Sequence, residues 1–244
     1  MSLSSLQKGL ILLDAVVEDG GRSSVASLAR SLGMPVATAH RHISALVAAG
    51  YLSSAGYGRH IAGPRLCAMV QKVDEKQIIT NVAAPILNRL AAKTGCVVQL
   101  GTFENDMVTY RLKTGESAGE LFTKVGMQLE AYCSGIGKVL LAHLPAPLQK
   151  AYLATGPFPA LTPHTITDSD LLKDELDRVV HLGFALDDEE VVTGLQCVAV
   201  PVPADNRDVI AAISASRATG AGLSTERLVP MLKAAAAEIS QRVG

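Results

Sequence analysis

Apolar residues at helical spacing divide the first 50 residues into three short segments. In the first segment they are Leu3, Leu6, Leu10, Leu13 and Val17. This pattern predicts an amphipathic helix that ends near Gly20. Ser24 can cap a second helix, which Gly33 closes, and Pro35 suits the first turn of a third helix that runs to about Ala49. Two short helices joined by a tight glycine-containing turn are typical of a helix-turn-helix.

The third helix is expected to have a buried face and a DNA-facing side. With a rotation of about 100° per residue, its apolar side chains share one face: Ala39, Ile43, Leu46 and Val47. The opposite face carries Thr38 and Arg41, and His40 lies on its flank. Thr38 can bond a phosphate or a base, and Arg41 can form paired hydrogen bonds with guanine or a phosphate. The alternative is a solvated helix face that contains one arginine.

Two short strands around a glycine-rich tip follow the third helix. Residues 51–54 and 60–62 flank the tip at 55–59, a pattern that predicts a β-hairpin, here a wing with Arg59 near the phosphate backbone. Residues 1–63 are therefore expected to form a winged helix-turn-helix, mainly α with a β wing. Pro64 opens another helical stretch, which predicts a linker helix over 64–76.

Beyond residue 76 the hydrophobic pattern predicts strands as well as helices. One strand pair is expected at 96–102 and 107–112 around turn residues 104–106, and a second at 197–202 and 209–216 around 205–208. Helices are expected at about 134–144, 168–182 and 225–242. Strand pairs with intervening helices predict an α+β domain with an antiparallel sheet over residues 77–244.

The charge distribution favours a small basic module joined to an acidic one. The net charge of the 244 residues is −1, yet residues 1–66 hold six Lys and Arg against three Asp and Glu. The four cysteines lack metal-ligand spacing, so neither a metal nor a cofactor is expected. No apolar run has the length of a membrane span, which indicates a cytoplasmic protein with free thiols.

Several short motifs together point to a known family. In the first half they occupy residues 24–29, 33–35, 38–41 and 63–66, and in the second half residue 129 with 134–142, 183–190, 197–199 and 212–216. In these motifs the chain resembles the IclR family of transcriptional regulators. The resemblance implies a GAF-like effector-binding domain, double-stranded operator DNA as partner, and assembly as a homodimer or homotetramer. The residues expected at the DNA are Pro35, Thr38, His40, Arg41 and Arg59.

The same resemblance implies one pocket for a small-molecule effector. Its residues would be Leu129, Gly135, Ile136, Asp187, Cys197, Ser214 and Ser216. Backbone N–H groups at a helix start, such as those of Gly135 and Ile136, can hold an anionic oxygen. Ser214 and Ser216 lie two apart on a strand and share one face. These groups suit a small carboxylate or an aldehyde. Without the resemblance, residues 187–190 would be a solvated acidic turn, and Cys197 an inert core thiol.

The sequence therefore predicts a DNA-binding regulator, expected to be a repressor, rather than an enzyme. The alternative is a cysteine-dependent hydrolase of a small ester or aldehyde, with Cys197 paired to one of three histidines: His143, His164 or His181. A plain interaction module is a third class, but it would not need a polar pocket. Residues 134–138 look like part of a phosphate-binding loop, yet Tyr132 replaces its first glycine and Val139 follows the lysine.

Overall fold

The computed structural model of the chain describes residues 3–204 and 208–243. It divides into two compact units, Met1–Asp74 and Glu75–Gly244, and each has a hydrophobic core of its own. Within the described ranges, no helix combines the length and the apolar character needed to cross a membrane.

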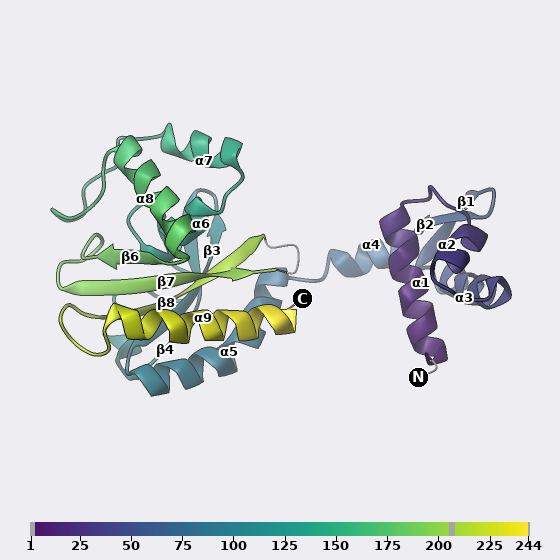
Figure 1. The fold of residues 1–244 in the computed structure, drawn as a ribbon, viewed down its shortest axis with the longest axis horizontal. Coiled ribbons are helices and arrows are strands. Elements are labelled where there is room, and N and C mark those ends of the chain that lie inside the picture. The colour runs from purple at the N-terminus through teal and green to yellow at the C-terminus, as the bar shows by residue number, and fades with distance from the viewer. Residues whose placement is uncertain (1–2, 205–207, 244) are drawn as a thin grey trace. The chain divides into compact units, whose positions relative to one another are not determined.

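The described part of the first unit contains three helices, a hairpin and a short fourth helix (Figure 1). They are α1 (Ser5–Asp19), α2 (Val25–Ser31), α3 (Val36–Ala48), β1 (Leu52–Gly56), β2 (Arg59–Ala62) and α4 (Pro64–Val70). The Ser24 hydroxyl caps α2 by accepting from the N–H of Ser27 at 3.3 Å. Gly33 follows α2 with φ at 62°, a left-handed conformation that glycine adopts without steric cost. The winged helix-turn-helix predicted from the sequence is confirmed.

The apolar stripe that indicates the first helix is not the side of α1 that faces the core. Leu12 and Val16 are buried in the core of the first unit, whereas Leu6 is 72% and Leu10 50% exposed. Because α1 carries apolar side chains around most of its circumference, periodicity alone does not identify the side that meets α2 and α3. Of the expected stripe, Leu13 is partly buried against the core. The other four residues of the stripe are exposed: Leu3, Leu6, Leu10 and Val17.

The expected linker helix over 64–76 is divided in two. Helix α4 ends at Val70, and the next helix, α5 (Glu75–Thr94), starts after four residues outside either helix. None of the described side chains of α4 is buried, so α4 lacks the tertiary packing that sustains most protein helices. The N–H groups of Lys72 and Val73 bond carbonyls three residues back, which tightens and closes the turn.

The second unit is built on an antiparallel sheet in the order β5-β4-β3-β8-β7-β6. Its strands are β3 (Val97–Glu104), β4 (Met107–Thr114), β5 (Gln128–Glu130), β6 (Ala185–Asp188), β7 (Leu195–Pro203) and β8 (Val209–Ala218). Its helices after α5 are η1 (Glu116–Gly119), α6 (Gly135–Ala142), α7 (Ala146–Leu153), α8 (Ser169–Leu182) and α9 (Thr225–Val243). This arrangement confirms the α+β domain with an antiparallel sheet.

Helices cover both faces of this sheet (Figure 1). Helices α5 and α9 pack on one face, where Ile213 of β8 is fully buried. Helices α6 and α8 belong to the core of the other face, which includes Ala212 of β8. Because side chains alternate along a strand, Ala212, Ser214 and Ser216 all turn toward the α6 side. The two serines are 3% exposed, so they do not form a solvated strand face.

Four short elements of the second unit are not anticipated by the sequence pattern: η1, β5, α7 and β6. Strand β6 occupies part of the segment that reads as an acidic turn, and it pairs with β7 through Asp187↔Cys197. Four residues are too few for a period-two pattern to stand out, so tertiary pairing decides this strand. Of the turn expected at 205–208, residues 205–207 lie outside the described residues.

Candidate functional site

The residues expected at the DNA come from α3 and the wing. The sequence predicts Pro35 in the first turn of α3, but it is the N-cap, and the helix begins one residue later, at Val36. The Pro35 carbonyl accepts the N–H of Thr38 at 2.9 Å. Pro35, His40 and Arg41 are exposed and Thr38 is half-buried, whereas Ile43 on the opposite side is 2% exposed. Helix α3 therefore presents the Arg41 guanidinium on its outer side while its inner side fills the core.

The tip of the wing carries an aromatic side chain that sequence reasoning missed. Tyr57 is 94% exposed and has φ at 52°, and the Arg59 guanidinium lies 5.6 Å from the centre of its ring. This distance is in the range of cation–π pairs. The flanking glycines Gly56 and Gly58 mark a tight turn in the sequence, but only the structure reveals the exposure of Tyr57.

His40 of α3 lies close enough to His60 of the wing to affect the pKa of His60. Burial lowers the pKa of His60 below its usual 6.5, and the neighbouring His40 lowers that pKa further. Two ring nitrogens, His60 Nδ1 and His42 Nε2, are buried without a hydrogen-bond partner in the described structure. His60 is therefore mostly neutral at pH 7.

In the second unit, three of the expected effector residues lie side by side on adjacent strands. The register pairs Asp187 of β6 with Cys197 of β7, and Cys197 with Ser216 of β8. The Cys197 thiol lies 3.1 Å from the Ser216 hydroxyl. Asp187 is 3% and Cys197 9% exposed. The sheet thus assembles a buried polar row from residues that are far apart in the sequence.

This row lines a small cavity, here called the inner cavity. Its volume is about 10 Å³, and Leu129 lies on its wall together with Asp187, Cys197 and Ser216. The remaining wall residues are Gln99, Tyr110, Leu121, Phe122, Thr123, Val191 and Leu195. A volume of this size is at the lower limit for one water molecule.

The start of α6 lies beside this row on β7. A methyl group on Gly135 would lie 3.3 Å from Cβ of Ala199 and 3.6 Å from the Cys197 carbonyl. The Ser134 hydroxyl accepts the N–H of Gly137 at 3.1 Å. The N–H groups of Gly135 and Ile136 have no acceptor within the described residues. Two helix-start donors are therefore available close to the polar row.

Three of the expected effector residues are not among those that line the inner cavity: Gly135, Ile136 and Ser214. The Ile136 side chain packs toward β3, since a methyl group on Gly101 would meet Ile136 Cγ2 at 2.9 Å. Ser214 pairs with Gln99 and Ala199 in the neighbouring register position. The structure thus brings four of the seven expected residues around one cavity and places the other three on elements that adjoin it.

Two family models match the chain. The IclR helix-turn-helix domain matches residues 5–56, and the C-terminal domain of the bacterial transcriptional regulator IclR matches residues 70–241. The chain belongs to the IclR family. It is therefore a regulator of transcription whose first unit is a DNA-binding domain.

Individual IclR-family proteins agree with this assignment. The chain is 31% identical to the HTH-type transcriptional repressor AllR of Klebsiella pneumoniae, over 87% of this chain and 79% of that protein. The crystal structure of Thermotoga maritima IclR is similar with a TM-score of 0.65 and 28% identity, covering 98% of each chain. An IclR homologue from Microbacterium hydrocarbonoxydans, solved in complex with 4-hydroxybenzoate, shares the fold with a TM-score of 0.65 at 24% identity, covering 98% of this chain and 99% of that one.

A buried charge cluster lies next to the polar row in this IclR-family domain. Lys138 of α6 is 1% exposed, and it forms an ion pair with Glu190, another with Glu175 at 3.2 Å, and a hydrogen bond to the Leu186 carbonyl at 2.5 Å. Burial raises the pKa of Glu190 to about 7, against the lowering effect of Lys138. The reading of the 187–190 segment as a solvated turn is wrong for Glu190, which is 4% exposed.

The chemistry of the row does not support the hydrolase alternative. Burial raises the pKa of the Cys197 thiol well above its usual 9, and the neighbouring Asp187 raises that pKa further. A nucleophilic cysteine needs the opposite shift, toward the thiolate. Burial also raises the pKa of Asp187, to about 6.

In the described part of the chain, no group of three or more His, Cys, Asp or Glu side chains is placed to hold a metal ion.

Proposed function

We propose that this IclR-family regulator binds operator DNA through α3 and the wing, and that a small carboxylate or carbonyl metabolite controls this binding. It represses transcription in the ligand-free state. The DNA contacts are made by Pro35, Thr38, His40, Arg41 and Arg59. The observation that supports this proposal most is the exposed Arg41 guanidinium on a helix whose other side is buried.

The first experiment tests DNA recognition. Selection from a randomised duplex library identifies the preferred sequence, and binding is then compared for Arg41→Ala and for Arg227→Ala, an exposed arginine of the second unit. Arg41→Ala is expected to weaken binding by about 1–3 kcal/mol, roughly 5- to 150-fold, if Arg41 contacts a base edge. Arg227→Ala is expected to bind like the parent. Equal binding by all three proteins contradicts the assigned face.

The effector is proposed to bind between the start of α6 and the polar row. The free N–H groups of Gly135 and Ile136 suit an anionic or carbonyl oxygen, and Asp187, Cys197, Ser214 and Ser216 offer further polar contacts, with Leu129 as an apolar wall. That an IclR homologue was crystallised with 4-hydroxybenzoate supports a carboxylate as the class of ligand.

The second experiment tests effector control. Small acids and aldehydes, including glyoxylate, pyruvate and 4-hydroxybenzoate, are screened for thermal stabilisation and for release of the selected duplex. The double variant Ser214→Ala, Ser216→Ala is expected to lose the response of the parent while its ligand-free DNA binding is unchanged. Ser169→Ala, which removes a hydroxyl bonded to the Leu153 carbonyl on α7, is the control. A double variant that still responds like the parent places the ligand elsewhere.

We also propose that the regulator acts as a homodimer or a dimer of dimers. Leu6 and Leu10 expose an apolar side of α1 in the single chain, and a small module with few cations gains affinity when two copies bind adjacent half-sites. Light scattering of the free protein and of its complex with the selected duplex measures the state. A monomer in both measurements contradicts this part of the proposal.

A further inference from the structure

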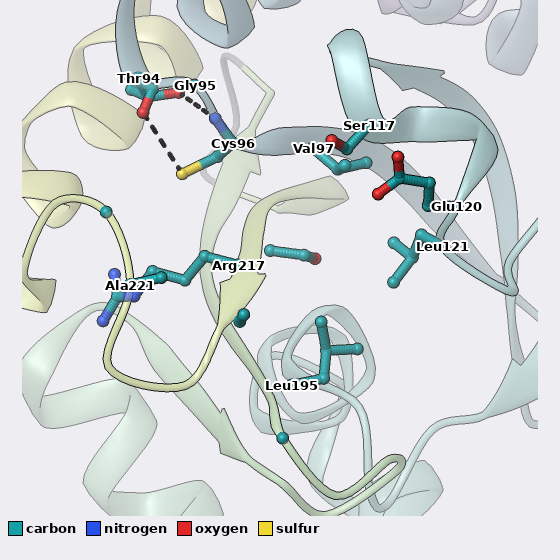
Figure 2. A pocket seen from close by; sticks show the side chains of 14 residues that line it. Thr94, Gly95, Cys96, Val97, Ser117, Glu120, Leu121, Leu195, Arg217 and Ala221 are labelled. Atoms are coloured by element: carbon teal, nitrogen blue, oxygen red, sulfur yellow. Dashed lines mark hydrogen bonds between the residues drawn. The ribbon is translucent and has the colours of Figure 1, made fainter.

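A second, larger pocket lies directly beside the inner cavity. This outer pocket has a volume of about 370 Å³, a size typical of small-molecule sites. It lies where β3 and β7 begin and β8 ends, and Figure 2 shows Cys96, Glu120, Leu121, Leu195 and Arg217 around it. The inner cavity, at about 10 Å³, is too small for any organic ligand.

The two spaces share three wall residues: Leu121, Leu195 and Ser216. Ser216 is 3% exposed and belongs to the polar row, whereas Leu121 and Leu195 are half-buried apolar side chains. The boundary between the pockets therefore consists of one fixed polar residue and two leucines.

The backbone on both sides of this boundary is held by hydrogen bonds. Lys113 Nζ donates to the Leu121 carbonyl at 2.7 Å and also to the Thr123 carbonyl. The Leu195 carbonyl accepts the N–H of Glu189 at 3.0 Å. Because the backbone is anchored, rotation of the leucine side chains is the smallest movement that joins the two spaces, and such rotations occur on fast timescales.

We propose that the outer pocket is the entrance to the effector site, and that Leu121 and Leu195 form a movable partition between the two pockets. Small organic acids and carbonyl compounds enter from the outer pocket and reach the polar row when the leucines rotate aside. This inference rests on the proposed effector function. The Arg217 guanidinium plays no part in it, since Figure 2 shows it turned toward Ala221 and away from both leucines.

A competing entrance exists on the other side of the inner cavity. Phe122 also lines that cavity and is 41% exposed, so a path past its ring is the alternative route from solvent. The outer pocket is favoured because a formed space lies outside the leucines, whereas Phe122 is absent from the lining of the outer pocket. Leu195→Ala and Phe122→Ala are therefore a matched pair of truncations.

The chain carries its own reporter of access, because Cys197 lies in the inner cavity. The full-length protein is treated with methyl methanethiosulfonate, and mass spectrometry of peptides follows each cysteine separately. Cys67 is exposed and reports reagent activity. Cys133 is 0% exposed and does not line either pocket, so it reports unfolding. This measurement needs neither DNA nor an identified effector.

Leu195→Ala is expected to raise the labelling rate of Cys197 at least tenfold and to leave that of Cys133 unchanged. Phe122→Ala is expected to change the Cys197 rate less than twofold. Ala218→Trp is expected to slow Cys197 labelling below the parent, because Ala218 is exposed, lines the outer pocket and pairs with Leu195 across the sheet. Its bulk fills the entrance without touching the core.

Two outcomes overturn the inference. One is a Cys197 rate that rises at least as much in Phe122→Ala as in Leu195→Ala, which places the entrance at Phe122. The other is a rate in Leu195→Ala that equals the parent. Failure of the proposed function is a separate result, in which Cys197 labelling follows the expected pattern but no ligand changes DNA binding.

Discussion

Removal of the buried ammonium of Lys138 tests the electrostatics of the second unit. In Lys138→Met the carboxylate of Glu190 loses its ion-pair partner, and the Leu186 carbonyl loses a hydrogen bond of 2.5 Å. Glu175 keeps a second partner, because Arg178 Nε lies 2.9 Å from its carboxylate. The uncompensated charge is therefore that of Glu190, whose Oε2 atom has no hydrogen-bond partner in the described structure.

The expected cost at pH 8 is about 3–5 kcal/mol, the usual result of breaking a buried ion pair from one side. The cost depends on pH. The folded-state pKa of Glu190 is about 7 in the parent, above its ordinary 4.5, and it rises further without Lys138. A carboxyl with a raised folded-state pKa loses stability as the pH rises through that pKa. At pH 5.5 Glu190 holds a proton, and the cost falls to about 1–3 kcal/mol for the unpaired Leu186 carbonyl.

Urea unfolding followed by near-UV circular dichroism of tyrosine measures this cost. The chain has no tryptophan, and Tyr110, Tyr132 and Tyr152 all belong to the core of the α6 face. Lys138→Met with Glu190→Gln is expected to recover most of the loss at pH 8. Lys173→Met removes an exposed ion pair and is expected to cost less than about 1 kcal/mol. An equal loss at both pH values, or no recovery in the double variant, refutes the reasoning.

Three further substitutions test other parts of the structure. Gly137→Ala places a methyl group 2.1 Å from the Ala131 carbonyl oxygen, and we expect a loss of about 3 kcal/mol in urea unfolding, because backbone must move; an unchanged midpoint contradicts this. Tyr57→Ala is expected to weaken duplex binding several-fold and to leave the melting temperature unchanged, since Tyr57 is 94% exposed. Because burial raises the pKa of Asp187 to about 6, affinity for a carboxylate probe is expected to increase as the pH falls from 8 to 6, and Asp187→Asn should remove this slope in a titration.

The DNA-binding unit is largely predictable from local signals. Ser24, Gly33 and Pro35 mark helix ends through side-chain and backbone chemistry that acts within a few residues. The buried side of α3 follows from the position of Ala39 and Ile43 relative to Arg41. The core-facing side of α1 is not predictable in this way, because apolar residues surround most of that helix, and long-range packing decides which of them meet the core.

The polar row of the second unit cannot be predicted from local sequence signals. Asp187, Cys197 and Ser216 come together only through the register of three strands, and one of these strands, β6, has too few residues for a recognisable pattern. The resemblance to the IclR family implies the three residues as a set, whereas composition and spacing alone favour a solvated turn for Asp187. The role of Glu190 as the buried partner of Lys138 had no sequence signal.

The segment 187–190 joins the inner cavity to the buried charge cluster. The Asp187 carboxylate lies on the cavity wall and accepts the N–H of Glu190 at 2.9 Å. Glu190 in turn pairs with Lys138, one turn from the start of α6 at Gly135. A ligand that bonds both Asp187 and the Gly135 amide therefore touches two ends of one connected network.

A ligand shifts a conformational equilibrium only through different free energies of interaction with the two states. Because Lys138, Glu190 and Asp187 are all buried, a change in charge or position at Asp187 acts on the other two residues. Under the proposed effector control, we expect a bound acid to act on α6 through this cluster.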